Sequence, residues 1–199
     1  MRKYSKIFFA IFVLLFVSSS AFGLSDAFKK NVYDPGQLKP IDSKLKVKLG
    51  EKAPDFTLPS LSGEKISLSQ FEGKKNVVIS FVPAAWTPVC SDQWPGYNLA
   101  KVIFEKNGAV LLGITVDNIP TLYAWTNQMG ELWFPVLSDF WPHGKVSKMF
   151  GVLRSDGVAE RALFIIDKKG VLRYAHVSDI NKRPDLKDLA TELEKLNKN

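Results

Sequence analysis

Cysteine and histidine are nearly missing from this chain. Cys90 is the only cysteine among 199 residues, which excludes an internal disulfide and the Cys-x-x-Cys pair of most thiol–disulfide exchangers. The only histidines, His143 and His176, have no ligand-like spacing to each other or to Cys90, so we expect no metal site. The sequence also lacks a dinucleotide fingerprint, a Gly-rich phosphate loop and a serine-hydrolase elbow, and we therefore expect no cofactor.

A strong excess of charge is missing as well. The formal net charge is +7, but three of the bases lie within the first six residues. The remaining 24 bases and 20 acids give a net charge of +4, without a dense basic cluster. Such a mild excess is poor support for nucleic-acid binding, and we expect no nucleic-acid partner.

The N-terminus has the pattern of a secretory signal. Its basic start is followed by an uninterrupted apolar run over residues 7–17, and then by small residues around Ala21-Phe22-Gly23. This pattern predicts a signal peptide over residues 1–23 and a periplasmic or secreted protein. The rival interpretation is a retained anchor. The apolar run is short for a bilayer span of about 20 residues, so we expect no stable membrane insertion after the signal is removed.

The rest of the chain divides into an arm and one domain. Residues 24–48 are polar and unpatterned and predict a linker or surface arm, and residues 49–199 predict a single domain. Apolar strands alternate with helices, an order that predicts an α/β, thioredoxin-like fold with a mixed central sheet flanked by helices. Expected strands cover 76–82, 109–116, 134–137, 162–167 and 171–177, expected helices cover 90–106, 120–129, 145–150 and 184–196, and an N-terminal hairpin extension joins 55–58 to 63–68.

Cys90 lies where the first central strand gives way to a helix. A thiolate is favoured at a helix N-terminus and beside a cation. Thr87, one turn earlier, is placed to donate its hydroxyl to the sulfur or to an incoming oxygen, and Pro83 gives an apolar wall without a donor. Arg161, at the start of the strand over 162–167, is the best candidate for the cation. This set suits the cleavage of a peroxide O–O bond.

Pro83, Thr87 and Cys90 have the spacing of the Pro-x-x-x-Thr-x-x-Cys signature, and the chain resembles peroxiredoxins of the AhpC/TSA-redoxin superfamily. It is most similar to the one-cysteine, alkyl hydroperoxide reductase E-type branch, over about residues 46–178. The resemblance implies a thiol-dependent peroxidase. It implies that Cys90 is the peroxidatic nucleophile, that Thr87 and Arg161 orient the peroxide, and that Pro83 shields the sulfur.

Two features depart from that branch. Gln93 stands where many relatives have glutamate, and Trp94-Pro95-Gly96 predicts an interruption of the helix. Because no second cysteine exists, an external thiol or a thioredoxin- or glutaredoxin-like protein must recycle the sulfenic acid. A homodimer is possible on the resemblance.

Blander interpretations of the same residues stay open. Cys90 alone fits a buried structural thiol, Thr87 a local cap, and Arg161 a surface ion pair with Glu160 or Asp156. A redox sensor or a thiol–disulfide exchange or assembly factor would use the same cysteine.

Overall fold

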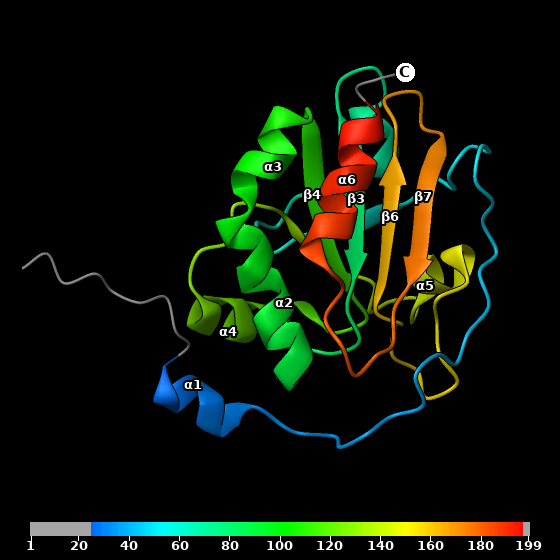
Figure 1. Ribbon diagram of the computed structural model, residues 1–199. Helices are drawn as coiled ribbons and strands as arrows, with labels where there is room; N and C mark the ends of the chain where they lie inside the picture. The colour runs from blue at the N-terminus through cyan, green and yellow to red at the C-terminus, as the bar shows by residue number, and fades with distance from the viewer. Residues whose placement is uncertain (1–24, 197–199) are drawn as a thin grey trace, which may run out of the picture.

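The computed structural model describes residues 25–196, so the predicted signal peptide over 1–23 lies outside the described residues. Seven strands alternate with six α-helices and one short 3-10 helix in this part of the chain (Figure 1). The strands are β1 Thr57–Pro59, β2 Lys65–Ser67, β3 Asn76–Phe81, β4 Ala109–Thr115, β5 Val136–Ser138, β6 Ala162–Ile166 and β7 Leu172–Val177. The helices are α1 Asp26–Asn31, α2 Pro88–Leu99, α3 Lys101–Lys106, α4 Ile119–Met129, α5 Lys145–Phe150 and α6 Leu186–Leu196, with the 3-10 turn η1 over Leu68–Phe71.

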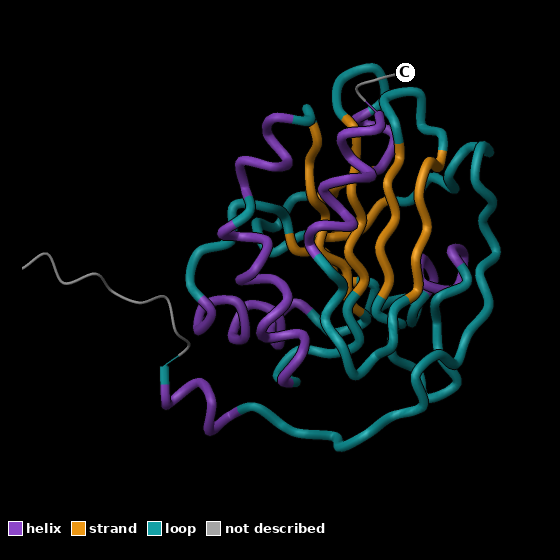
Figure 2. The backbone as a smooth tube through the Cα atoms, viewed as in Figure 1, coloured by secondary structure: helices purple, strands orange, loops and turns teal. Residues whose placement is uncertain are grey.

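Five strands form one mixed sheet in the order β5-β4-β3-β6-β7 (Figure 2). β3 pairs in parallel with β4, and β4 with β5, whereas β6 pairs antiparallel with both β3 and β7. β1 and β2 form a separate antiparallel hairpin. The structure confirms the predicted thioredoxin-like α/β fold and its N-terminal hairpin.

Each face of the sheet carries its own apolar core. Alternate residues of a strand point to opposite faces. Val78 of β3 belongs to the core shared with α2, α3, α4 and α6, whereas Val77, Ile79 and Phe81 belong to the core shared with α5 and the hairpin. Every residue of β3 is buried, as its predominantly apolar sequence predicts for a central strand.

The predicted helix interruption at Pro95 is wrong. α2 continues through Pro95, and the break lies at Ala100, whose φ and ψ of −93° and 12° separate α2 from α3. Pro95 removes one backbone donor. The buried Trp94 and Tyr97 on either side of it hold this part of the helix against the sheet. Burial of two large aromatic rings outweighs one missing hydrogen bond.

A contact with β4 fixes the position of α2. A Cβ on Gly113 would lie 2.8 Å from Cζ2 of Trp94, closer than carbon atoms approach. Glycine at this position of β4 therefore lets the indole lie directly on the sheet, and it sets the height of α2 above β3.

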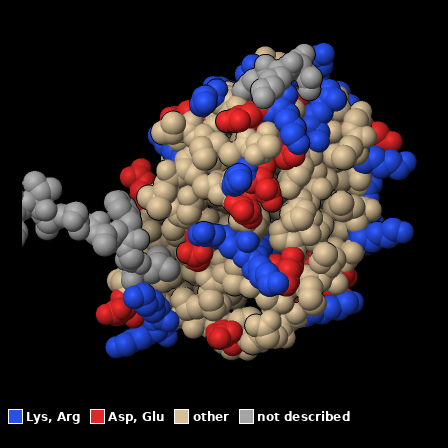
Figure 3. Space-filling view, viewed as in Figure 1, with Lys and Arg blue, Asp and Glu red and all other residues tan. Residues whose placement is uncertain are grey.

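Residues 25–48 form an arm that crosses the domain. From α1 the arm runs past the end of the sheet where β3 leads into α2, and it then rises beside β7 (Figure 1, blue to cyan). None of the helices within residues 25–196 has both the length and the hydrophobicity to span a bilayer. Acidic and basic side chains are interspersed over the face drawn in Figure 3.

Candidate active site

The junction between β3 and α2 places Cys90 in the third position of a helix. Thr87 is the N-cap residue of α2 and Pro88 takes the first helical position, where its missing N–H is tolerated. The Ser91 N–H donates to the Thr87 carbonyl oxygen at 3.0 Å. The N–H groups of Val89 and Cys90 precede this bond, so they have no acceptor within the helix. They lie at the positive end of the helix dipole.

Arg161 lies beside this sulfur because of the strand register. Phe81 at the end of β3 pairs with Ala162 at the start of β6, so the residue before β6 is adjacent to the loop that follows β3. The Nη2 atom of Arg161 donates to Sγ of Cys90 at 3.4 Å. Both side chains are inaccessible, since Cys90 is 0% and Arg161 2% exposed.

The other partners of Arg161 are neutral. Its Nη1 atom donates to Oε1 of Gln93 at 2.6 Å, and Nε and Nη2 both donate to the carbonyl oxygen of Ile180, at 3.1 and 3.0 Å. Within residues 25–196 the guanidinium has no carboxylate partner. A buried cation is strongly destabilising without an anion. Among its described partners, Sγ of Cys90 is the one group that can ionise to an anion.

The alternative of an Arg161 ion pair with Glu160 or Asp156 is wrong. Arg154 makes both of those ion pairs, with Nη1 2.9 Å from Oε2 of Glu160 and Nε 3.2 Å from Oδ2 of Asp156. Hydrogen bonds and charge from Glu160 and Asp156 raise the pKa of Arg154 despite its burial. Arg154 is therefore paired with two carboxylates, whereas the described hydrogen-bond partners of Arg161 include no carboxylate.

Gln93 connects Arg161 to a buried polar chain. Its Nε2 atom donates to the hydroxyl of Tyr97 at 3.0 Å and to Oγ of Ser80 at 3.2 Å. Burial raises the pKa of Tyr97 to about 12, so its phenol stays neutral in the physiological range. The amide thus orients the guanidinium without adding a negative charge that would compete with the sulfur.

Thr87 and Pro83 border a cavity next to this cluster. The Thr87 hydroxyl donates to the Ala84 carbonyl oxygen at 2.9 Å, so in this state its proton points to the loop and not to the sulfur. Pro83 is buried, and with Thr87 and Arg161 it lines a cavity of about 420 Å³. Cys90 does not itself line this cavity, and its sulfur lies behind Arg161.

Asp117 also holds this loop, and the sequence analysis did not find it. Oδ2 of Asp117 accepts the Ala85 N–H at 2.8 Å. Trp86 has a φ of 61°, a left-handed backbone that costs a non-glycine residue of the order of 1–3 kcal/mol. Asp117 is the second residue after β4, the strand parallel to β3, and this position at the carboxyl end of a neighbouring strand is the signal that would have identified it.

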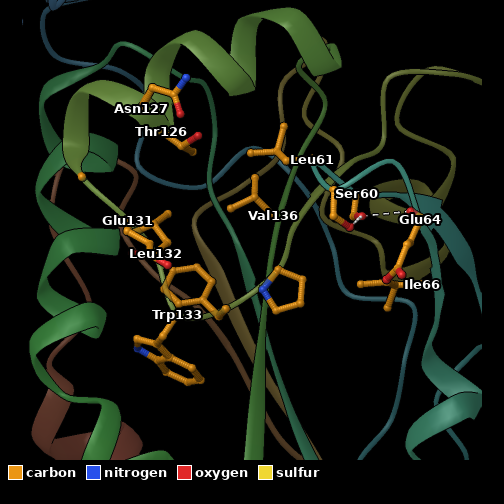
Figure 4. A pocket seen from close by; sticks show the side chains of 14 residues that line it. Ser60, Leu61, Glu64, Ile66, Thr126, Asn127, Glu131, Leu132, Trp133 and Val136 are labelled. Carbon is orange, nitrogen blue, oxygen red and sulfur yellow. Dashed lines mark hydrogen bonds between the residues drawn. The ribbon is translucent and has the colours of Figure 1, made fainter.

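A larger cavity, of about 500 Å³, lies away from this chemistry. It opens between the end of α4 and the hairpin, where Thr126 and Asn127 face Ser60 and Glu64 (Figure 4). It contains neither a cysteine nor an arginine. No group of three or more potential metal ligands occurs in the described part of the chain.

Comparison with known proteins places these features in context. The sequence profile of the AhpC/TSA family matches residues 49–175. Alkyl hydroperoxide reductase E of Mycobacterium tuberculosis is 38% identical over 130 residues, which cover 65% of this chain and 84% of that protein. Mouse Peroxiredoxin-2 is 38% identical over 142 residues, covering 66% of this chain and 70% of that protein.

Solved structures show the same resemblance. The reduced 2-Cys peroxiredoxin of Plasmodium vivax superposes with a TM-score of 0.72 at 26% identity, covering 76% of this chain and 83% of that chain. The mitochondrial 2-Cys peroxiredoxin of Plasmodium falciparum gives a TM-score of 0.69 at 30% identity, covering 75% of this chain and 94% of that chain.

Proposed function

The chain belongs to the AhpC/TSA family and is a peroxiredoxin, a thiol-dependent peroxidase, and from this premise we propose that it reduces hydrogen peroxide or organic hydroperoxides with Cys90 as its only redox-active sulfur. One observation carries the proposal. Among residues 25–196, the buried guanidinium of Arg161 has only neutral partners apart from Sγ of Cys90, which lies 3.4 Å from Nη2. This geometry favours an anionic sulfur beside a fixed donor.

In the oxidation step, the Cys90 thiolate attacks the hydroxyl oxygen of the hydroperoxide. The S–O bond forms as the O–O bond breaks, and the electron pair leaves on the second oxygen as alkoxide or hydroxide. Arg161 stabilises the charge that develops on this oxygen, which then takes a proton from water. The Thr87 hydroxyl turns from Ala84 to orient the peroxide, and Pro83 keeps water from the sulfur. The products are a Cys90 sulfenic acid and an alcohol or water.

In the recycling step, an external thiol resolves the sulfenic acid. The thiol sulfur bonds to Sγ of Cys90 and water leaves, which gives a mixed disulfide. A second thiol then attacks this disulfide and releases the Cys90 thiol, and the two reducing thiols leave as a disulfide with each other. A small thiol or a thioredoxin- or glutaredoxin-like protein supplies both reducing equivalents, because Cys90 is the only cysteine in the chain.

Peroxide consumption by the purified protein with an added thiol tests the proposal. We expect many turnovers per chain, and a mass increase of one oxygen on Cys90 when peroxide is added without thiol. Cys90→Ser keeps the size of the side chain and should abolish both. Undiminished turnover in this variant would refute the proposal, and a single oxidation event without recycling would favour a redox sensor.

Export and dimerisation complete the proposal. The basic start and apolar run within residues 1–23 support cleavage of a signal peptide, which the mass of the protein recovered from the host periplasm would test. The exposed rings of Tyr123, Phe140 and Trp141 are available for contact with a second copy. Light scattering over a range of concentrations would measure this assembly.

A further inference from the structure

The arm over residues 25–48 contacts both segments that position the reacting groups. One segment is the loop over 82–87, which leads into Cys90. The other is the segment over 178–181, which contains the carbonyl acceptor of Arg161. The arm lies entirely outside the 49–175 match to the family.

The contact with the first segment is centred on Trp86. The ring of Phe28 in α1 lies 5.7 Å from the ring of Trp86, and Phe28 is 0% exposed. The Tyr33 N–H donates to the carbonyl oxygen of Trp86 at 2.7 Å. The arm thus holds both the side chain and the backbone of the residue with a left-handed φ, next to the N-cap of α2. A strained conformation persists where its surroundings fix it, and Asp117 and the arm fix this one from two sides.

The contact with the second segment is a set of backbone and amide hydrogen bonds. The Ile180 N–H donates to the Pro40 carbonyl oxygen at 3.0 Å, while the Ile180 carbonyl oxygen accepts from Arg161. Asn181 exchanges two hydrogen bonds with the backbone of Leu38, at 2.9 and 2.8 Å. The arm therefore holds the peptide that orients the guanidinium.

The arm is also one wall of the active-site cavity. Residues 33–38 line the cavity of about 420 Å³ opposite Pro83 and Thr87. The cavity has room for a peroxide. A protein thiol, however, has to bring its sulfur to bonding distance of Sγ of Cys90, which is 0% exposed.

We propose that the arm is a positioning cover for the peroxidase site, anchored by Phe28. When the arm is docked, it aligns the loop and Arg161 for attack on a peroxide. When it is displaced, it admits the thiol of a protein reductant, whose sulfur bonds to Cys90 as water leaves the sulfenic acid. Loosening the arm therefore has opposite effects on the two half-reactions, slowing oxidation by peroxide and accelerating reduction by a protein thiol. This kinetic part rests on the proposed function, whereas the access of reagents to Cys90 does not.

Phe28→Ala removes the anchor, Phe28→Leu keeps a buried apolar side chain, and Lys30→Ala alters an exposed position of the same helix as a control. Tyr33→Pro is a second, independent variant that deletes the N–H given to Trp86 together with an exposed side chain. The preceding Val32, at φ −76° and ψ 123°, already has the conformation that a following proline requires. Reduced protein is treated with iodoacetamide and with a polyethylene-glycol maleimide. The rates of Cys90 oxidation by hydrogen peroxide, and of reduction by thioredoxin and by 2-mercaptoethanol, are then measured.

We expect Phe28→Ala to raise the rate of maleimide labelling by at least about tenfold, since a fully buried phenylalanine anchors a surface segment strongly. Oxidation by peroxide should slow by about tenfold, reduction by thioredoxin should accelerate, and reduction by 2-mercaptoethanol should change less. Phe28→Leu should restore most of each rate, and Tyr33→Pro should change them in the same direction as Phe28→Ala.

Three results would refute the proposal that the arm covers the site. They are unchanged maleimide labelling in Phe28→Ala, a parallel fall of oxidation and thioredoxin reduction, and equal effects on the large and the small thiol. Labelling needs no peroxidase activity, so the cover is tested even if peroxide leaves Cys90 unoxidised. In that case only the proposed function fails.

Discussion

Replacing Arg161 with glutamine removes the cation next to Cys90 and keeps a polar side chain. At the 3.4 Å separation of Nη2 and Sγ, an effective dielectric of about 20 gives an attraction of about 5 kcal/mol between guanidinium and thiolate, an upper limit on the loss. Loss of one preorganised donor at a developing oxyanion slows catalysis by about 10²–10³-fold, or roughly 3–4 kcal/mol. We therefore expect oxidation of Cys90 by hydrogen peroxide to slow by about 10²–10³-fold in Arg161→Gln.

Stopped-flow tryptophan fluorescence measures this rate, because Trp86 and Trp94 lie close to the reacting sulfur in the chain. Arg161→Lys keeps the charge but not the forked donors, and we expect it to recover part of the rate. Arg183→Gln is the matched control, since Arg183 is half exposed and pairs with Asp92 at the surface. The reasoning fails if Arg161→Gln, folded by circular dichroism, oxidises within about threefold of the unmodified protein.

Thr87→Val should slow oxidation by about 10–100-fold, whereas Thr87→Ser, which keeps the hydroxyl, should stay close to the unmodified rate in the same assay. Hydrogen bonds from Lys39 and Ser155 hold the pKa of Asp42 well below 3.8, so its carboxylate stabilises the fold above that pH and the contribution is lost as the pH falls below it. Urea unfolding should accordingly show a smaller loss of stability between neutral pH and about pH 3 in Asp42→Asn, and an equal loss would contradict the assignment. Gly113→Ala should destabilise by about 1–3 kcal/mol in urea unfolding, because its Cβ would overlap Trp94. Gly96→Ala is its control, since that Cβ meets only the flexible end of a surface arginine, and equal destabilisation of the two variants would count against this packing.

The sequence predicted the sheet well because its strands carry a local signal. β6 is an uninterrupted apolar run and β3 a predominantly apolar one, and the structure pairs them as the thioredoxin-like order requires. The neighbourhood of Cys90 and Arg161 was also predictable, since the loop that leads into Cys90 follows β3 and Arg161 directly precedes β6, the strand paired with β3. The position of the helix break was not, because it depends on how Trp94 packs against Gly113, a contact between residues distant in the chain.

The ion-pair partners of the charged side chains likewise could not be predicted from the sequence pattern. Arg154 and Arg161 both lie near Glu160 in the chain, and only the three-dimensional arrangement directs Arg154 to the acid and Arg161 to the sulfur. The arm gave no periodic signal either. Its attachment depends on one buried ring, Phe28, on backbone hydrogen bonds that any sequence can make, and on distant side chains such as Asn181.

The neutral setting of Arg161 has a thermodynamic consequence for the oxidised protein. A sulfenic acid carries no negative charge at its oxygen-bearing sulfur, so oxidation of Cys90 leaves an enclosed guanidinium with no counter-ion in the part of the chain that the structure describes. The oxidised protein should therefore melt at a lower temperature than the reduced one, which differential scanning calorimetry of the two forms would show, and equal melting temperatures would contradict this. This reasoning predicts that the stability of the fold depends on the redox state of a single atom, with the reduced protein, ready for the next peroxide, as the more stable form.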